Sequence, residues 1–327
     1  MIDILYMGGM GRSGSTLLER LLGQFEGSVA VGELRYLWAE DPTIARCGCG
    51  RLLVECPFWG EVLERAGIAA TGATFAEMLA VQQRVDRLRY IPHMMVRPLA
   101  GRTYAQYYQT YSDALQRVYR AAYEVGGGRI IVDSSKDISM LYLLARMEEV
   151  HLRLMHLVRD SRAVAYSWTK TVVRPHTVDQ VTYMDRYSPT RSAADWLYRN
   201  TLTEAARRYA DGYLRLRYED MIADPRTTLR RAAEFMGLPD ADLSFVGADE
   251  IDLPREIHTV AGNPMKFKPG ALRLRLDDAW QEALGASDRR IVTAATWPLL
   301  RRYGYSRDGH QRHEQRAELA AADRAQR

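Results

Sequence analysis

Hydrophobic positions near the start of the chain predict a buried strand followed by a glycine-rich turn and a helix. The apolar run at 4–7 ends in two glycines, which is typical of a strand that leads directly into a turn. The next apolar positions recur at helical spacing: Leu17, Leu18, Leu21 and Leu22. A strand, a glycine-rich turn and a helix in this order form the local structure that a phosphate-binding loop requires.

Three later segments repeat the strand-like pattern, and a helix-like segment follows each of them. These apolar runs lie at 129–135, 152–160 and 213–220. Strands that alternate with helices favour a parallel sheet covered on both faces. We therefore predict an α/β protein with a single domain, in which helices flank a central parallel sheet.

Three other stretches follow different patterns. Residues 57–125 are predicted to form a helical insertion, whose seven tyrosines could wall an acceptor pocket or simply pack among the helices. Residues 171–189 show no clear period and indicate a loop or lid. The segment 306–327 is polar and carries charges of both signs, so we expect a solvated tail outside a domain that covers 1–305.

Composition narrows the possible classes of function. The chain has 327 residues, 47% of them hydrophobic, and its net charge of +4 is too small to indicate a nucleic-acid surface by itself. No apolar run approaches the roughly 18 residues of a membrane helix, and Asp3 stands where a signal peptide would be basic. Three cysteines form no disulfide framework in a chain of this length, so we expect a cytoplasmic protein. The oligomeric state stays open.

The turn after the first strand nearly matches the phosphate-binding pattern G-x-x-x-x-G-K-[ST]. In "YMGGMGRSGSTLLERLL", Gly9 and Gly14 have the required spacing and Thr16 ends the pattern, but Ser15 replaces the lysine. The cation lies earlier, at Arg12, which favours a smaller anion bound without a metal ion. An ordinary turn rich in glycine and serine is the alternative interpretation.

Two later motifs carry cations that could bind an anion. Arg159 ends a predicted strand and Ser167 lies on the next helix, so both could bind one phosphate at the carboxyl edge of the sheet. The alternative is a surface arginine paired with Asp160 beside an ordinary helix serine. A loop with two prolines could cover an anion, or could simply be solvated. Its candidate residues are Lys266, Lys268 and Gly270.

In this order on one chain, the motifs resemble the sulfotransferases that use 3′-phosphoadenosine 5′-phosphosulfate (PAPS), especially bacterial members and the protein-tyrosine sulfotransferases. "RSGST" resembles the family's 5′-phosphosulfate loop, "VRDSRAVAYS" its 3′-phosphate motif, and "YEDMIADP" the segment whose tyrosine lies near the adenine. The resemblance covers roughly 4–280 and implies a single P-loop domain related to nucleotide kinases. It implies these donor-binding residues: Gly11, Arg12, Ser13, Gly14, Ser15, Thr16, Leu17, Arg159, Ser167, Tyr218, Lys266, Lys268 and Gly270. Many members have Arg-Lys-Gly where this chain has "KFKPG", so which lysine meets the 3′-phosphate stays open.

Transfer to a hydroxyl requires a base for the acceptor proton and positive charge near the leaving oxygen. Glu33 in "VAVGELRYLW" and Lys136 in "VDSSKD" both fall where the ligand edge of the sheet should be. The resemblance to protein-tyrosine sulfotransferases implies that Glu33 is the base and that Lys136 serves the sulfuryl group. We predict Arg12 as a further catalytic cation, because charge builds on the sulfuryl and bridging oxygens as the bond breaks. A helix-terminal charge and a solvated cation are the alternatives. Rival bases, ranked below Glu33, are His93, His176 and His258.

The three cysteines lie close together in "CGCGRLLVECPFW", at Cys47, Cys49 and Cys56. They could bind zinc with a fourth ligand from elsewhere, or two of them could oxidise as a pair. Their spacing fits no zinc knuckle, and the sequence reveals no fourth ligand. We therefore interpret them as a local structural cluster.

The predicted function is transfer of a sulfuryl group from PAPS to a hydroxyl of a small molecule, sugar or lipid, without a metal ion. The second product would be adenosine 3′,5′-bisphosphate. A P-loop kinase-like phosphotransferase is the alternative, disfavoured by Ser15 and by the lack of a clear Mg²⁺-binding aspartate. A non-catalytic nucleotide-binding protein is a third possibility, but it would need neither Glu33 nor Lys136.

Overall fold

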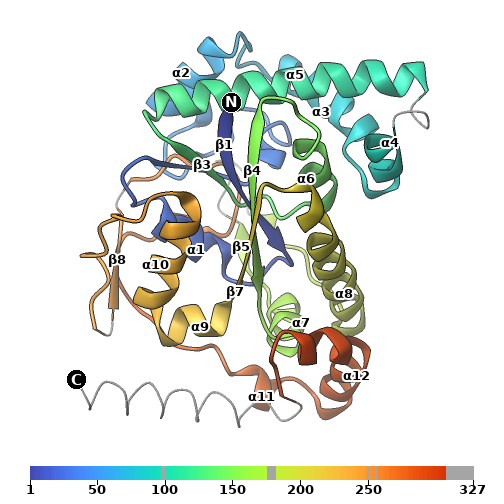
Figure 1. The fold of residues 1–327 in the computed structure, drawn as a ribbon, viewed down its shortest axis with the longest axis vertical. Helices are drawn as coiled ribbons and strands as arrows, with labels where there is room; N and C mark the ends of the chain where they lie inside the picture. Colours follow the sequence, from blue (N-terminus) through green and yellow to red (C-terminus); the bar gives the residue numbers. More distant parts are fainter. Residues whose placement is uncertain (97–100, 175–181, 249, 255, 307–327) are drawn as a thin grey trace.

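A sheet of five parallel strands forms the centre of the molecule, in the order β2-β3-β1-β4-β7 (Figure 1). The computed structural model describes residues 1–96, 101–174, 182–248, 250–254 and 256–306. The five strands are β1 (Ile2–Gly9), β2 (Ser28–Gly32), β3 (Ile130–Asp133), β4 (Val150–Val158) and β7 (Gly212–Arg217). The predicted α/β class with a central parallel sheet is confirmed.

Strand β1 shows why helices cover both faces of this sheet. Ile4 and Tyr6 point into one hydrophobic core, whereas Leu5 and Met7 point into the other, because successive side chains of a strand alternate. On the first face lie α2 (Pro57–Arg65), α5 (Arg102–Val125), α6 (Ile138–Leu144) and α8 (Pro189–Ala206). On the second face lie α1 (Ser15–Leu22) and α10 (Pro225–Met236).

The stretch predicted as a helical insertion, 57–125, is helical in its described part. Between α2 and α5 it contains α3 (Gly72–Val85) and α4 (Ile91–Met95), and α5 runs along one end of the sheet (Figure 1). The expected loop or lid at 171–189 contains a short antiparallel pair, β5 (Val173–Arg174) with β6 (Thr182–Tyr183). The tail from 307 onward lies outside the described residues.

The largest differences from the predicted strands concern β7 and β2. The pattern at 213–220 predicted a strand throughout, but β7 ends at Arg217 and helix α9 (Tyr218–Ala223) begins directly. Glu219 and Asp220 lie in the first turn of α9, where the helix dipole stabilises negative charge. Strand β2 is not among the strands that the apolar runs predict, because an edge strand of five residues carries little periodic signal.

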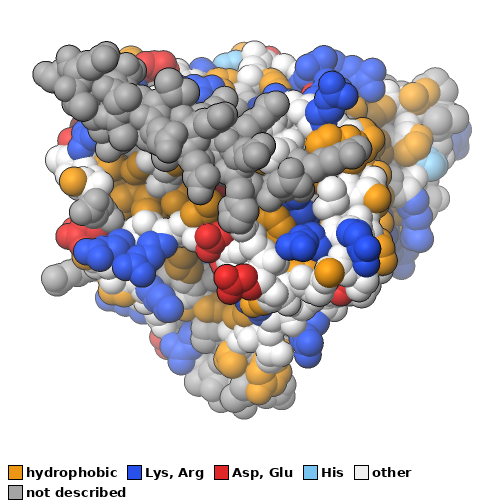
Figure 2. All heavy atoms as spheres, turned by 90° about the horizontal axis from the view of Figure 1, so that it is seen from below, with side chains coloured by type: hydrophobic (Ala, Val, Ile, Leu, Met, Phe, Trp, Pro, Cys, Tyr) orange, Lys and Arg blue, Asp and Glu red, His pale blue; other side chains and the backbone are white. Residues whose placement is uncertain are grey.

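The remaining α-helices and strands follow β4 in the chain. They are α7 (Ser161–Thr169), β8 (Glu250–Leu253), β9 (Gly270–Arg273), α11 (Trp280–Ala283) and α12 (Ala286–Arg302). On the face shown in Figure 2, basic side chains gather at several places, with acidic and apolar side chains between them. Among the described helices, none combines the length and the apolar character needed to cross a membrane.

Candidate active site

A cleft of about 650 Å³ opens at the carboxyl ends of the parallel strands, the edge at which open α/β sheets bind ligands. The segment that follows each strand contributes to its lining. The contributing residues include Arg12 after β1, Glu33 after β2, Lys136 after β3, Arg159 after β4 and Tyr218 after β7. The fold thus gathers into one cleft residues that are more than two hundred positions apart.

The glycine-rich turn takes its shape from its own sequence. Gly14 is in the left-handed region, with φ 88°, and forms the N-cap of α1. A Cβ atom at this position would lie 2.4 Å from the Tyr218 ring, so only glycine fits. Because α1 begins at Ser15, its free N–H groups lie at the cleft and favour an anion. The turn residues that line the cleft are Gly11, Arg12, Gly14, Ser15, Thr16 and Leu17.

Ser13 is the predicted turn residue that does not line the cleft. Its side chain is buried, and its Oγ has no hydrogen-bond partner among the residues that the structure describes. Arg12, next to it, stacks over Trp168, with 5.0 Å between the guanidinium carbon and the ring centroid. The turn therefore offers both backbone N–H groups and a positioned cation.

Arg159 is buried at the cleft, and the surface-arginine alternative is wrong for it. Its Nη2 lies 3.2 Å from an Asp277 carboxylate oxygen, and its Nη1 donates to the Arg12 carbonyl at 3.1 Å. Its guanidinium also stacks over Tyr218 at 4.4 Å. Asp160 instead forms an ion pair with Arg162, at 2.6 Å. Ser167, on α7, lines the same cleft.

Glu33 and Lys136 meet in an ion pair, with 2.8 Å between Oε1 and Nζ. The Lys136 ammonium also donates to the Ser134 carbonyl, and its own backbone carbonyl accepts a bond from Arg199 at 3.3 Å. Lys136 has a φ of 58°, in the left-handed region that costs a non-glycine residue about 1–3 kcal/mol. The only other described non-glycine residues with positive φ are Arg12 and Ala261, and both line this cleft. Backbone strain is therefore concentrated at the cleft.

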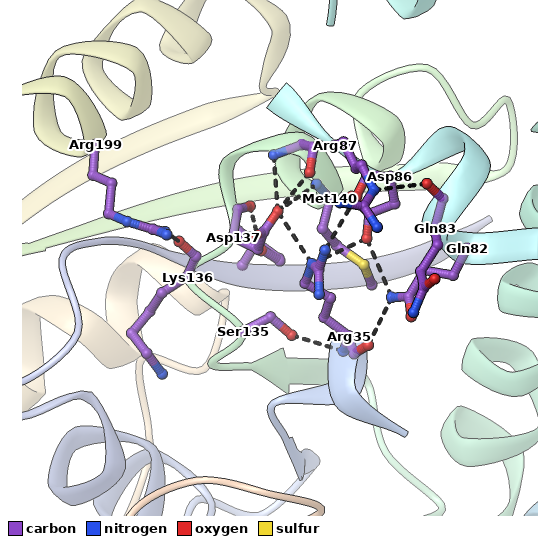
Figure 3. Close-up of polar contacts among 12 residues, drawn as sticks. Arg35, Gln82, Gln83, Asp86, Arg87, Ser135, Lys136, Asp137, Met140 and Arg199 are labelled. Atoms are coloured by element: carbon purple, nitrogen blue, oxygen red, sulfur yellow. Dashed lines mark hydrogen bonds and ion pairs between the residues drawn. The ribbon is translucent and has the colours of Figure 1, made fainter. Parts of the chain in front are cut away.

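A largely buried polar network centred on Arg35 lies next to Lys136 (Figure 3). The Arg35 Nε lies 3.1 Å from an Asp86 carboxylate oxygen and 3.2 Å from an Asp137 carboxylate oxygen. The backbone N–H of Arg35 donates to Ser135 Oγ at 3.1 Å. Burial raises the pKa of Asp86 to about 6. Since Asp86 ends α3, the insertion supports the loops that carry Glu33 and Lys136 from outside the cleft.

Two charged residues of α1, Glu19 and Arg20, also position the site, although the sequence analysis did not single them out. The Glu19 carboxylate accepts bonds from the Gly32 N–H at 2.7 Å and from the Ser134 hydroxyl at 2.8 Å. Gly32 directly precedes Glu33, and Ser134 lies two residues before Lys136. Burial raises the pKa of Glu19 to about 8. The sequence pattern that could have identified them is a pair of adjacent charges inside the apolar run "LLERLL". Charges buried in such a helix require partners elsewhere in the fold.

Arg20 contacts the loop that contains the predicted lysines. Its guanidinium donates to the carbonyls of Met265 at 2.8 Å, Lys268 at 2.7 Å and Pro254 at 3.0 Å. The loop therefore has a defined position over α1. Its cleft-lining residues are Val260, Ala261, Gly262, Asn263 and Met265.

The structure does not bring Lys266, Lys268 or Gly270 to the cleft. Lys266 is buried, and its Nζ donates to the carbonyls of Arg46 at 3.2 Å and Thr259 at 3.5 Å. Lys268 is exposed, and Gly270 begins β9. Their assignment to the donor stays a prediction from the family resemblance.

The rival histidines lie elsewhere. His93 packs against Tyr104 within the insertion, and His258 stacks on Phe58. Neither histidine lines the cleft, and His176 falls outside the described residues. The seven tyrosines of the insertion, all of them described, do not line it either.

Comparison with known proteins identifies the family of this chain. Residues 5–242 match the sequence profile of the sulfotransferase family. Two curated relatives, the carbohydrate sulfotransferase 7 proteins of Rattus norvegicus and Mus musculus, are 33% and 32% identical over 123 residues. That stretch is 38% of this chain, and it spans only 22% of the length of each relative.

Solved structures with detectable similarity carry the same family name. The sulfotransferase domain from the curacin biosynthetic pathway is 14% identical, with a TM-score of 0.44 over 90% of this chain and 98% of that one. The sulfotransferase domain from the Synechococcus PCC 7002 olefin synthase is 18% identical, with a TM-score of 0.39 over 90% of this chain and 93% of that one. Because the match to the family profile covers most of the chain, this protein belongs to the sulfotransferase family.

Proposed function

We propose that the protein transfers a sulfuryl group from PAPS to a hydroxyl of an acceptor and releases adenosine 3′,5′-bisphosphate. The observation that carries this proposal is the Glu33–Lys136 pair, which lies in the same cleft as the anion-binding turn. A carboxylate and an ammonium in contact provide both groups that the reaction needs, a base and a cation.

The donor would lie along one side of the cleft. The turn at 11–17 would bind the 5′-phosphosulfate through backbone N–H groups and the hydroxyls of Ser15 and Thr16. Arg159 and Ser167 would bind the 3′-phosphate, and the stacked Tyr218 would lie beside the adenine. Before the donor binds, Asp277 neutralises Arg159, so the 3′-phosphate would replace a carboxylate as its partner.

The transfer step uses Lys136, Arg12 and Glu33. The acceptor oxygen forms a bond to sulfur while the bond from sulfur to the bridging oxygen breaks, and its electron pair leaves on the 5′-phosphate. Lys136 and Arg12 would stabilise the charge that develops on the leaving oxygen. Glu33 would take the acceptor proton. A donor that competes for the Lys136 ammonium would release Glu33 from its ion pair and leave it free to act.

The acceptor is proposed to be a small molecule, sugar or lipid with a free hydroxyl. On the Glu33 side the cleft is lined by polar side chains, among them Tyr36, Glu40, Asp195 and Arg199. Such groups suit an acceptor with several hydroxyls, and the name of the carbohydrate sulfotransferase relatives makes sugars the first compounds to test. We place the reaction in the cytoplasm, since none of the three cysteines forms a disulfide in the structure.

A thermal-unfolding screen tests the donor. Adenosine 3′,5′-bisphosphate should raise the melting temperature without added metal, because a ligand of the native state stabilises it. Adenosine 5′-phosphosulfate, which lacks the 3′-phosphate, should bind more weakly. Stabilisation by ATP with Mg²⁺ and not by the bisphosphate would instead indicate a phosphotransferase.

Turnover tests the chemistry. Radiolabelled PAPS should transfer its sulfuryl group to a member of a panel of sugars, alcohols and phenols. Lys136→Met should lower kcat much more than it weakens donor binding. A rise in the donor KM alone would make Lys136 a binding residue and overturn its catalytic role.

A further inference from the structure

The three cysteines acquire a fourth neighbour in the fold, His258. Cys47 and Cys56 are buried, while Cys49 and His258 are half-buried. One ligand atom from each of the four lies within 4.8 Å of all the others. His258 is 202 positions after Cys56 in sequence, which is why spacing alone did not reveal it.

The separations match those of a tetrahedral zinc site. Zn²⁺ binds sulfur at about 2.3 Å and imidazole nitrogen at about 2.0–2.1 Å, so ideal ligands lie roughly 3.8 Å (two sulfurs) or 3.6 Å (sulfur and nitrogen) apart. In the structure, 3.5 Å separates the sulfurs of Cys47 and Cys56. The His258 Nδ1 lies 3.3 Å from the Cys56 sulfur and 4.0 Å from the Cys47 sulfur. Shifts of about an ångström in the side-chain positions would bring all four ligand atoms to tetrahedral distances.

The backbone presents these side chains in a fixed arrangement. Cys47 donates its N–H to the Arg51 carbonyl at 2.9 Å and accepts a bond from the Gly50 N–H at 2.9 Å, which closes a tight turn around Cys49. Gly50 has a φ of 86°, the left-handed conformation that such a turn needs. The same turn brings Cys47 and Cys49 to one side.

His258 is fixed from the opposite side. Its ring stacks on Phe58, with centroids 5.3 Å apart and an interplanar angle of 14°. The Trp59 indole donates to the His258 carbonyl at 2.8 Å. Phe58 and Trp59 directly follow Cys56 and Pro57, so α2 orients both a cysteine and the histidine.

From these contacts we propose that Cys47, Cys49, Cys56 and His258 bind one Zn²⁺ ion. Three thiolates and one imidazole are soft to borderline ligands, which favour zinc over magnesium or calcium. Four protein ligands leave no open position for a substrate, so the site is structural. None of the four lines the cleft, and the zinc site is separate from the transfer chemistry.

The zinc site would position the wall of the cleft beside Glu33. Two residues after His258, Val260 accepts a bond from the Glu33 N–H at 3.0 Å and donates to Val31 at 3.0 Å. Lys266 bridges the carbonyls of Arg46 and Thr259, which are the neighbours of Cys47 and His258. An ion at this point would therefore crosslink the segment at 46–56 to the loop that covers the catalytic carboxylate.

Metal content of the wild-type chain gives the first test. The full-length protein, purified in reducing buffer without chelator, should contain one zinc ion per chain by elemental analysis. Titration of its thiols should release that ion. Replacement by Co²⁺ should give the charge-transfer absorption of cobalt bound to thiolates. A chain with three free thiols that takes up no zinc on reconstitution would overturn the proposal, as would a Cys47–Cys56 disulfide under the same reducing conditions.

Two variants then test the ligand set. His258→Asn and Cys49→Ser should each weaken zinc binding, change the cobalt spectrum and lower the melting temperature. His151→Asn is the matched control, because this histidine of β4 pairs with Asp3 far from the cysteines. Unchanged zinc content and cobalt spectrum in His258→Asn would exclude the histidine as a ligand. If the variants fail to fold, the wild-type metal content still decides the question.

Discussion

The two sides of the cleft are stabilised by different kinds of interaction. The donor side, which we define as the turn at 11–17 with Arg159 and Tyr218, takes its form mainly from local backbone geometry. The transfer side, defined as Glu33 and Lys136 with the buried network around Arg35, depends on side chains from distant elements. Glu19 lies between the two sides, since it belongs to the helix of the turn but bonds to Gly32 and Ser134.

This difference predicts where substitutions act at a distance. A glycine turn and a helix N-terminus follow from the local sequence, so the turn at 11–17 depends less on remote charged partners than Glu33 and Lys136 do. Buried charges are stable only with partners, so the transfer side requires both Asp86, which caps the end of α3, and Asp137, which caps the start of α6. The helical insertion therefore contributes to the site without lining it.

The largest effect is expected from Glu33→Gln on the transfer side. This change keeps the shape of the side chain and removes its basicity, so kcat should fall on the order of 10²–10⁴-fold. Donor affinity should change little, which titration calorimetry with adenosine 3′,5′-bisphosphate would measure. Glu26→Gln, at an exposed glutamate that does not line the cleft, is the control and should retain turnover. Near-wild-type turnover in Glu33→Gln would assign the base elsewhere.

Arg159→Ala should give the next largest effect, and on the donor side. Loss of a charged hydrogen bond to the 3′-phosphate should cost about 1.5–3 kcal/mol, or roughly 10- to 150-fold in donor affinity. The measurement compares PAPS analogues with and without the 3′-phosphate. Arg159→Ala should weaken the binding of only the analogue that carries this phosphate. An equal loss of affinity for both analogues would place Arg159 at another part of the donor.

A pH titration of stability tests Glu19, which joins the two sides. Burial raises its folded pKa to about 8, so the stability it contributes is full below its unfolded pKa and is lost as the pH rises through about 8. The slope from this one group should reach about 1.4 kcal/mol per pH unit. The free energy of unfolding in urea should be measured for wild type and Glu19→Gln between pH 5 and pH 8.5. The difference between the two proteins isolates the contribution of Glu19, since the contributions of the other titratable groups are the same in both. Parallel curves for the two proteins would show that Glu19 does not titrate in this range.

The smallest effect is expected from Lys268→Ala. This lysine is exposed and does not line the cleft, so donor affinity should stay within roughly 0.5 kcal/mol of wild type. A loss as large as that of Arg159→Ala would support the role that the family resemblance implies. It would also show that the loop at 258–270 moves when the donor binds.

Much of the donor side was readable from the sequence. The strand, turn and helix at 4–22 formed as predicted, and the Arg159 and Tyr218 motifs reach the same cleft. Periodicity succeeds here because each element buries its own apolar positions. It failed for β2, an edge strand too short to carry a clear periodic signal, and for Glu19, whose partners Gly32 and Ser134 belong to other segments of the chain.

The sequence by itself determined the α/β class, the glycine-rich turn before the first helix and the residues that follow each strand, because these depend on local apolar spacing and on glycine. Only the tertiary structure decided which side chains meet. It paired Glu33 with Lys136, buried Lys266 away from the cleft, and brought His258 to the cysteines. The physical reason is that partners of buried polar groups are chosen by the packing of elements far apart in the chain, and local spacing carries no record of that packing.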